Sequence, residues 1–207
     1  MTQDNIKIES ICVFGDSTAW GAWDMEKGGW VNRLYFYISE KTRGETEIYN
    51  LSISGGTTET ILERFESEAK IRETDALIFQ SGGNDSYLKG KNRPNQIPID
   101  QFRKNLEEII KRARDITPNI IFIGFTNVDE AKTTPVLWKN IYYVNAEIKK
   151  YNEMVKNICQ ENDILYLDIF GLLNNKDFED GLHPNSAGHK KIFTKVRDFL
   201  VENKWII

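Results

Sequence analysis

The chain has 207 residues, of which 40% are hydrophobic and 28% are charged, and its formal net charge is −4. This length and composition predict a single globular domain over residues 1–207, and the negative charge without any Lys/Arg-rich run argues against a nucleic-acid partner. No apolar run approaches the length of a membrane span, and the polar N-terminus lacks the apolar core of a signal peptide. We therefore expect a cytoplasmic protein with no integral membrane segment.

Apolar runs alternate with amphipathic stretches along the whole chain. The runs at 6–14, 47–53, 75–83, 119–126 and 163–170 predict five buried strands. Apolar residues at helical spacing predict helices over 30–38, 61–65, 102–113, 144–158 and 192–200, and Pro118 is expected to end the third of them. This alternation predicts an α/β fold, a three-layer α/β/α sandwich around a flavodoxin-like, five-stranded parallel sheet in the order 2-1-3-4-5.

The segment 126–140 has no clear periodicity. Loops this long in a compact domain are usually functional or mobile. Its apolar residues Val136, Leu137 and Trp138 suggest a lid over a site. On this hypothesis, deletion of 133–138 would change substrate choice more than stability.

Short polar stretches follow several of the expected strands. In an open α/β sheet, ligands bind beyond the carboxyl ends of the strands, where the strand order reverses. The stretch "GDS", which ends at Ser17, follows the first expected strand, and "GGND", which contains Asn84, follows the third. The stretch "EDGLHPN" occupies 179–185, after the last strand. Because strands one and three flank the reversal, Ser17 and Asn84 are expected to face each other across the crevice.

Two histidines are present, and they sit in different contexts. His183 precedes Pro184, which disfavours a helical backbone at the histidine and places it in a turn before the last helix. Asp180 lies three residues earlier, close enough in a turn to orient the imidazole ring. His189 falls inside the last expected helix and is interpreted as a packing or surface residue.

These residues supply the parts for nucleophilic catalysis. Ser17 can attack a carbonyl only if a base takes its proton, and His183 is the candidate base, with Asp180 as its orienting acid. The oxyanion that forms needs donors already in place. The candidates are the backbone N–H groups of Ser17 and Gly55 and the side-chain amide of Asn84.

The chain resembles the SGNH (GDSL-type) hydrolases, a superfamily of esterases and lipases named for Ser, Gly, Asn and His in four sequence blocks. The blocks correspond to "GDS" with Ser17, "NLSISGGT" with Gly55, "GGND" with Asn84, and "DGLHPN" with Asp180 and His183. Thr18 stands where the name motif has leucine, and the Gly-x-Ser-x-Gly elbow of the α/β-hydrolases is absent. The resemblance implies a serine esterase that cleaves a small-molecule carboxylic ester through a Ser-His-Asp triad and an acyl-enzyme. Such chemistry needs no metal and no organic cofactor.

Several other readings of the same residues stay open. The machinery would equally serve a carbohydrate O-deacetylase or a thioesterase, and the fold could belong to a catalytically inactive binding module. The "ISGGTT" stretch before a helix could cradle an anion, but it lacks the lysine and the spacing of a P-loop.

Asp16 could be a phosphoryl acceptor, but no second aspartate stands close in sequence for magnesium. We expect Asp16 and Asp85 to orient local backbone by hydrogen bonding. Cys12 and Cys159 are expected to be buried free thiols, since no metal-ligand spacing is present.

The chain is rich in tryptophan directly after the candidate nucleophile. Trp30 fits the first helix and is expected in the core. Trp20 and Trp23 precede it in a loop, where they are possible walls of a substrate pocket, together with Val136 and Trp138 of the 126–140 segment. A buried structural role for Trp20 and Trp23 is the alternative.

Overall fold

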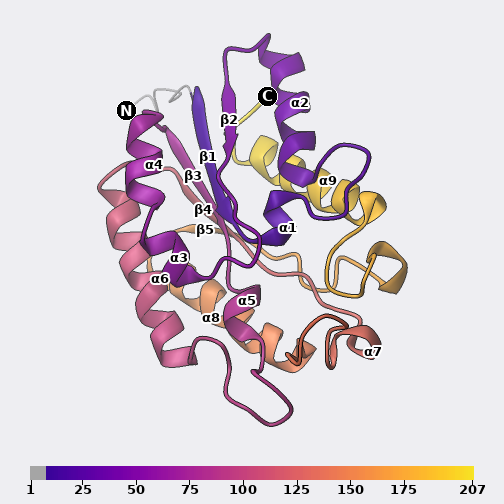
Figure 1. Ribbon diagram of the computed structural model, residues 1–207. Helices are drawn as coiled ribbons and strands as arrows, with labels where there is room; N and C mark the ends of the chain where they lie inside the picture. Colours follow the sequence, from indigo (N-terminus) through magenta and orange to yellow (C-terminus); the bar gives the residue numbers. More distant parts are fainter. Residues whose placement is uncertain (1–7) are drawn as a thin grey trace.

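The computed structural model describes residues 8–207, which contain one parallel β-sheet flanked by helices on both faces (Figure 1). The strands are β1 (Ser10–Gly15), β2 (Glu47–Asn50), β3 (Ala76–Gln80), β4 (Ile120–Ile123) and β5 (Leu165–Leu167). Their order is β2-β1-β3-β4-β5, and each neighbouring pair runs parallel. The predicted fold class and strand order are confirmed. Residues 6 and 7 of the first expected strand lie outside the described residues.

The longer helices form the two outer layers. On one side of the sheet lie α2 (Trp30–Thr42) and α9 (Ser186–Glu202), and on the other lie α3 (Thr58–Leu62), α4 (Phe65–Ile71), α6 (Ile99–Arg114) and α8 (Asn145–Glu161) (Figure 1). Successive strand residues point to opposite faces of a sheet. In β1, Ile11 and Val13 pack in the core with α2 and α9, whereas Cys12 and Phe14 pack in the core with the other four helices.

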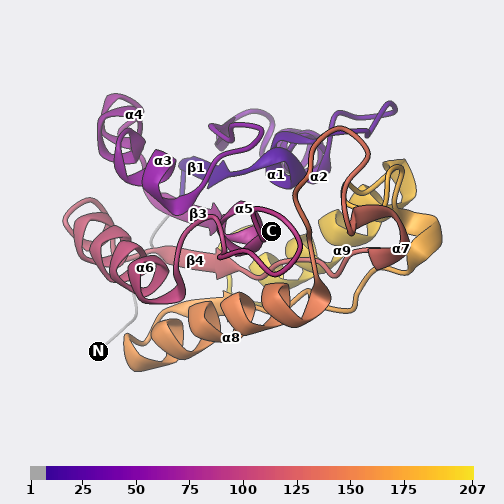
Figure 2. The same cartoon turned by 60° about the horizontal axis from the view of Figure 1, so that its bottom comes forward.

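The short elements lie beyond the carboxyl ends of the strands. Helix α1 (Ser17–Trp20) follows β1, α5 (Gly83–Ser86) follows β3, α7 (Glu130–Thr133) lies between β4 and α8, and a 3₁₀ turn (Asn175–Asp177) follows β5. Figure 2 turns this end of the sheet forward and shows α1 beyond the end of β1 and α5 beside the end of β3. These elements carry the candidate functional residues.

Three expected elements differ in detail from those in the structure. The single helix expected around 61–65 is two helices, α3 and α4, because the backbone at Arg64 leaves the helical region, with a φ of −136°. The backbone N–H of Arg64 donates to the carbonyl oxygen of Ile61, and its guanidinium lies over the ring of Phe14. Helix α6 ends at Arg114, four residues before Pro118, and so somewhat earlier than expected. Proline disfavours a helical backbone at the residue before it, so the helix is not expected to continue through residue 117. The 126–140 segment contains the short helix α7, whose N-cap is the side chain of Asp129.

The expected burial of three residues is confirmed. Cys12 and Cys159 are buried free thiols, and burial raises the pKa of each. Trp30 is fully buried, and its indole N–H donates to Gln80 Oε1 at 2.9 Å, which ties the start of α2 to the end of β3. Within residues 8–207, no helix combines the length and apolarity needed to cross a membrane.

Candidate active site

Ser17 is placed by the turn between β1 and α1. Strand β1 ends at Gly15, where a Cβ would lie 2.5 Å from Ala19 Cβ and 2.8 Å from the carbonyl oxygen of Gln80, so only glycine fits. Asp16 then caps α1, and its Oδ1 accepts from the backbone N–H of Thr18 at 2.9 Å. Ser17 is therefore the first residue of α1, and its relative exposure is only 7%.

His183 connects Ser17 to Asp180. The distance from His183 Nε2 to Ser17 Oγ is 3.0 Å, and the distance from His183 Nδ1 to Asp180 Oδ2 is 2.7 Å. An Nδ1–H donates to the carboxylate in this arrangement, which leaves Nε2 free to accept the Ser17 proton. The structure thus brings together three residues whose sequence positions span 17 to 183.

The turn that holds His183 is built around Asp180. The second carboxylate oxygen, Oδ1, accepts from the backbone N–H groups of Leu182 at 2.9 Å and His183 at 2.8 Å. Burial alone would raise the pKa of Asp180, but hydrogen bonds from the His183 ring and from these backbone groups lower it to about 2. Asp180 is therefore a carboxylate at neutral pH and faces the imidazole with a full negative charge.

Asn84 joins two of the loops at this edge. It is the second residue of α5, and its Nδ2 donates to the carbonyl oxygen of Gly56 at 2.9 Å. Its Oδ1 accepts from the hydroxyl of Tyr143 at 2.7 Å. The neighbouring Gly55 has a φ of +79°, a backbone region that glycine enters without strain. The backbone N–H of Ser17 lies in the first turn of α1, where helical N–H groups lack an acceptor within the helix.

Two buried carboxylates stand beside these donors. Asp16 lies next to Ser17, and burial raises its pKa to about 6 against the opposing effects of the Thr18 N–H and His183. Asp85 follows Asn84 and accepts from both the backbone N–H and the hydroxyl of Thr58. Burial also raises the pKa of Asp85, to about 7, and its hydrogen bonds to Thr58 fix α5 against the start of α3.

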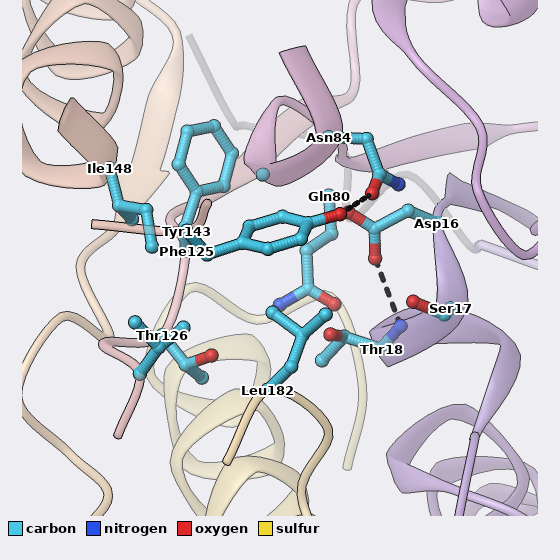
Figure 3. Close-up of a pocket in the computed structure, with 12 residues that line it drawn as sticks. Asp16, Ser17, Thr18, Gln80, Asn84, Phe125, Thr126, Tyr143, Ile148 and Leu182 are labelled. Carbon is cyan, nitrogen blue, oxygen red and sulfur yellow. Dashed lines mark hydrogen bonds between the residues drawn. The ribbon is translucent and has the colours of Figure 1, made fainter. Parts of the chain in front are cut away.

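A small cavity opens at Ser17 (Figure 3). Its volume is about 40 Å³, and Ser17 and Asn84 both line it, from the ends of β1 and β3 respectively. The lining residues combine polar groups near Ser17 with an apolar wall, and they are Asp16, Ser17, Thr18, Gln80, Gly83, Asn84, Phe125, Thr126, Val128, Tyr143, Ile148 and Leu182. In Figure 3 the ring of Tyr143 extends along the cavity with its hydroxyl directed at Asn84.

The residues suggested as pocket walls occupy three different settings. Trp20 and Trp23 are more than half exposed and are absent from the cavity lining, so neither a wall of this cavity nor a buried role holds for them. Val136 is buried in the hydrophobic core and also does not line the cavity. Trp138 lies on the imidazole of His183, with ring centroids 6.0 Å apart and an interplanar angle of 21°. Of the four, only Trp138 contacts a candidate functional residue in this way.

His189 lies apart from this chemistry. It is fully buried in α9, and its Nε2–H donates to the carbonyl oxygen of Ala22 at 2.9 Å. Burial lowers its pKa, which favours the neutral ring. It packs the loop after α1 against α9, in agreement with the packing role expected from its helical position.

Sequence reasoning missed Tyr143 and the apolar wall of the cavity. Tyr143 stands 59 positions from Asn84 and belongs to none of the four sequence blocks. Phe125 and Ile148 belong to apolar patterns that indicate only burial, and Leu182 lies inside the "DGLHPN" block without an expected role of its own. The available signal was their position: Phe125 follows β4 and Leu182 adjoins His183, both at the carboxyl end of the sheet.

The chain is similar in sequence to known esterases and lipases. The model of the GDSL-like lipase/acylhydrolase family matches residues 13–191. A GDSL esterase/lipase from Oryza sativa subsp. japonica is 22% identical over 205 residues, which cover 93% of this chain and 78% of the relative. An isoamyl acetate-hydrolyzing esterase 1 homolog from Rattus norvegicus is 24% identical over 199 residues, covering 88% and 78%.

Among solved structures, an acetylxylan esterase from Geobacillus stearothermophilus superposes with a TM-score of 0.73 at 18% identity, covering 95% of this chain and 96% of that one. This likeness concerns the fold. The family model, in contrast, spans most of the sequence, including the blocks that carry Ser17, Asn84 and His183. The chain therefore belongs to the GDSL-like lipase/acylhydrolase family of carboxylic ester hydrolases.

Proposed function

We propose that the protein is a serine esterase in which Ser17, His183 and Asp180 form the catalytic triad. The observation that carries this proposal is the continuous chain of contacts from Ser17 Oγ through the His183 ring to Asp180, with distances of 3.0 and 2.7 Å. A nucleophile within hydrogen-bond reach of a base, itself held by a third group, is the arrangement that acyl transfer requires.

The first half of the reaction forms an acyl-enzyme. Ser17 Oγ bonds to the ester carbonyl carbon while His183 Nε2 takes the hydroxyl proton, and the carbonyl oxygen becomes an oxyanion. The tetrahedral intermediate then collapses: the C–O bond to the alcohol breaks, and His183 returns the proton to the leaving alkoxide. Asp180 stays ionised throughout and stabilises the imidazolium.

The second half repeats these steps with water. His183 removes a proton from water, and the resulting hydroxide adds to the acyl carbon. The bond to Ser17 Oγ then breaks, His183 returns the proton to Oγ, and the acid is released. The oxyanion in both halves would accept from the N–H of Ser17, the N–H of Gly55 and the amide of Asn84. The placement of Ser17 and Asn84 on the same cavity supports this assignment.

The size of the cavity supports a short acyl group. On the same measure, a single water needs about 10–15 Å³. A cavity of about 40 Å³ therefore has room for only a few heavy atoms. An acetyl methyl group would fit against the apolar side formed by Phe125, Ile148 and Leu182, whereas a long acyl chain would not. Two of the similar proteins are named for the esters isoamyl acetate and acetylxylan, and both of these compounds are acetate esters.

We expect wild-type protein to cleave p-nitrophenyl acetate and to lose activity steeply as the acyl chain lengthens to octanoate. A fluorophosphonate should label one residue, and peptide mass mapping should place the label on Ser17. A Ser67→Ala variant serves as the control, because Ser67 is an exposed residue of α4 whose hydroxyl bonds only its own helix start. Labelling of another serine, or equal rates for acetate and octanoate, would contradict the proposal.

A carbohydrate acetate is the second candidate substrate, and Trp138 is the observation that favours it. Its indole lies on His183, the group that would protonate the leaving alcohol, yet 56% of the residue remains exposed. An exposed aromatic face beside the leaving-group side can stack on a sugar ring.

Replacement of Trp138 by alanine should then raise KM for an acetylated xylobiose by about tenfold, which corresponds to about 1.4 kcal/mol of lost binding. KM for ethyl acetate, which has no ring, should change little. Trp23→Ala is the matched control, since Trp23 is similarly exposed but, unlike Trp138, is not stacked on the ring of His183. Equal changes in KM for both esters would remove the sugar-stacking role.

A further inference from the structure

The geometry points to Tyr143 as a positioning residue that fixes the side-chain amide of Asn84 for oxyanion binding. This inference rests on the proposed function, because it concerns a donor of the same site. It starts from two contacts: the Tyr143 hydroxyl donates to Asn84 Oδ1 at 2.7 Å, and Asn84 Nδ2 donates to the carbonyl oxygen of Gly56 at 2.9 Å.

The two contacts distinguish the two ends of the amide. An amide turned by 180° would place Oδ1 against the carbonyl oxygen of Gly56, so that two acceptors would face each other. In the observed orientation, Oδ1 is occupied by Tyr143 and one N–H of Nδ2 is occupied by Gly56. The amide nitrogen carries two N–H groups, so one remains for an oxyanion. A donor to Oδ1 also polarises the amide and strengthens that remaining N–H.

Tyr143 is suited to act only as a donor here. It is buried, and burial raises the pKa of its hydroxyl, with a further contribution from the negative charge of Asp16. The phenol therefore keeps its proton through the neutral and mildly alkaline range. A buried tyrosine needs a partner for its hydroxyl, and Asn84 is that partner.

The rest of Tyr143 is held firmly. Its backbone N–H donates to the carbonyl oxygen of Thr133 at 3.0 Å, and its own carbonyl accepts from the Thr133 hydroxyl at 2.8 Å. Its ring meets the ring of Tyr87 edge-on, with centroids 5.4 Å apart. Through Tyr143, the segment between β4 and α8 thus supports an oxyanion donor that lies on α5.

The test is Tyr143→Phe, which keeps the ring and its packing but removes the hydroxyl. Asn84 Oδ1 would then lie buried without this donor. We expect kcat for p-nitrophenyl acetate to fall about tenfold, while KM stays within about twofold, because the lost effect concerns the transition state. Tyr87→Phe is the matched control: it removes a hydroxyl from the neighbouring ring and should leave kcat unchanged.

A double-mutant cycle separates positioning from general packing. Asn84→Ala alone should lower kcat by about a hundred- to a thousandfold, the usual effect of losing one oxyanion donor. If Tyr143 acts through Asn84, the double variant should be no slower than Asn84→Ala. The inference would be overturned if the losses in kcat of the two single variants multiplied in the double variant, or if Tyr143→Phe kept the full wild-type kcat. Neither result would bear on the proposed triad.

A second readout does not depend on turnover. The side-chain amide signals of Asn84 in a ¹H–¹⁵N spectrum can be assigned by their absence in Asn84→Ala. Tyr143→Phe should shift these signals, and Tyr87→Phe should not. Unmoved Asn84 signals in folded Tyr143→Phe would reject the positioning role. Failure of the proposed function would show differently, as a wild-type protein whose Ser17 reacts with neither esters nor fluorophosphonate.

Discussion

Replacement of Ser17 by alanine should lower kcat for p-nitrophenyl acetate by about 10⁶-fold, the loss seen when the nucleophile of a serine hydrolase is removed. Without Oγ no acyl-enzyme can form, and His183 has no hydroxyl to deprotonate. The residual rate would come from the oxyanion donors and substrate binding, which still favour direct attack by water. Steady-state kinetics of the purified protein measure the loss of kcat. Active-site titration with a fluorophosphonate measures the loss of the reactive hydroxyl.

The Ser17 variant should remain folded. Alanine is a good helix former, and the cap of α1 comes from Asp16, which the change leaves in place. Circular dichroism and the melting temperature therefore serve as the check on folding, with Ser67→Ala carried through every assay. A folded Ser17→Ala variant that retained more than about 1% of wild-type kcat would show that another group is the nucleophile.

Asp180→Asn should lower kcat by about 10⁴-fold, and the structure gives a specific reason for that size of effect. Asp180 Oδ1 accepts from two backbone N–H groups, those of Leu182 and His183. In the variant, the amide oxygen must take that position, because an NH₂ group there would face two donors. The amide nitrogen then faces His183 Nδ1 and donates to it. The imidazole proton is forced onto Nε2, which can no longer accept the proton of Ser17.

A matched control for the Asp180 variant is an exposed aspartate of α9. Asp198 is an exposed residue of α9 that pairs with Arg197, so Asp198→Asn should leave kcat unchanged. The wild-type carboxyl, with its pKa lowered to about 2, contributes no protonation step to the pH–rate profile above about pH 4. Near-normal kcat for Asp180→Asn at pH 7 would show that the carboxylate does not set the tautomer of His183.

The sheet could be predicted because its strands carry a strong local signal. Runs such as "ALIF" and "IIFI" are buried on both faces, so they are continuously apolar, and the fold rule for five parallel strands supplied their order. The break between α3 and α4 carried no such signal. The break falls at Arg64, whose guanidinium lies over the ring of Phe14, and a contact between residues 50 positions apart leaves no local pattern in the sequence.

The residues of the candidate site also differ in how far the sequence could predict them. Ser17, Asp180 and His183 could be proposed because together they supply a nucleophile, a base and an orienting acid, and because the fold rule places the loops that carry them at one edge of the sheet. Tyr143 could not, since a tyrosine in an aperiodic segment has no pattern that indicates its partner. Trp20 and Trp23 attracted attention through residue type and closeness in sequence to Ser17, but both are more than half exposed and neither lines the cavity.

The separation of Ser17 and His183, 166 positions along the chain, has a consequence for how the protein acquires activity. In the proposed mechanism, β1 delivers the nucleophile, and the base and its carboxylate arrive together in the turn just before α9. A fragment that lacks either β1 or that turn could not assemble the proposed triad, so on this proposal esterase turnover would report that both parts of the fold have come together. Such distant pairing also slows folding, because a long stretch of chain must be ordered before the contact can form. On the proposed mechanism, the chain would stay catalytically silent during synthesis until the turn that carries Asp180 and His183 has emerged and folded.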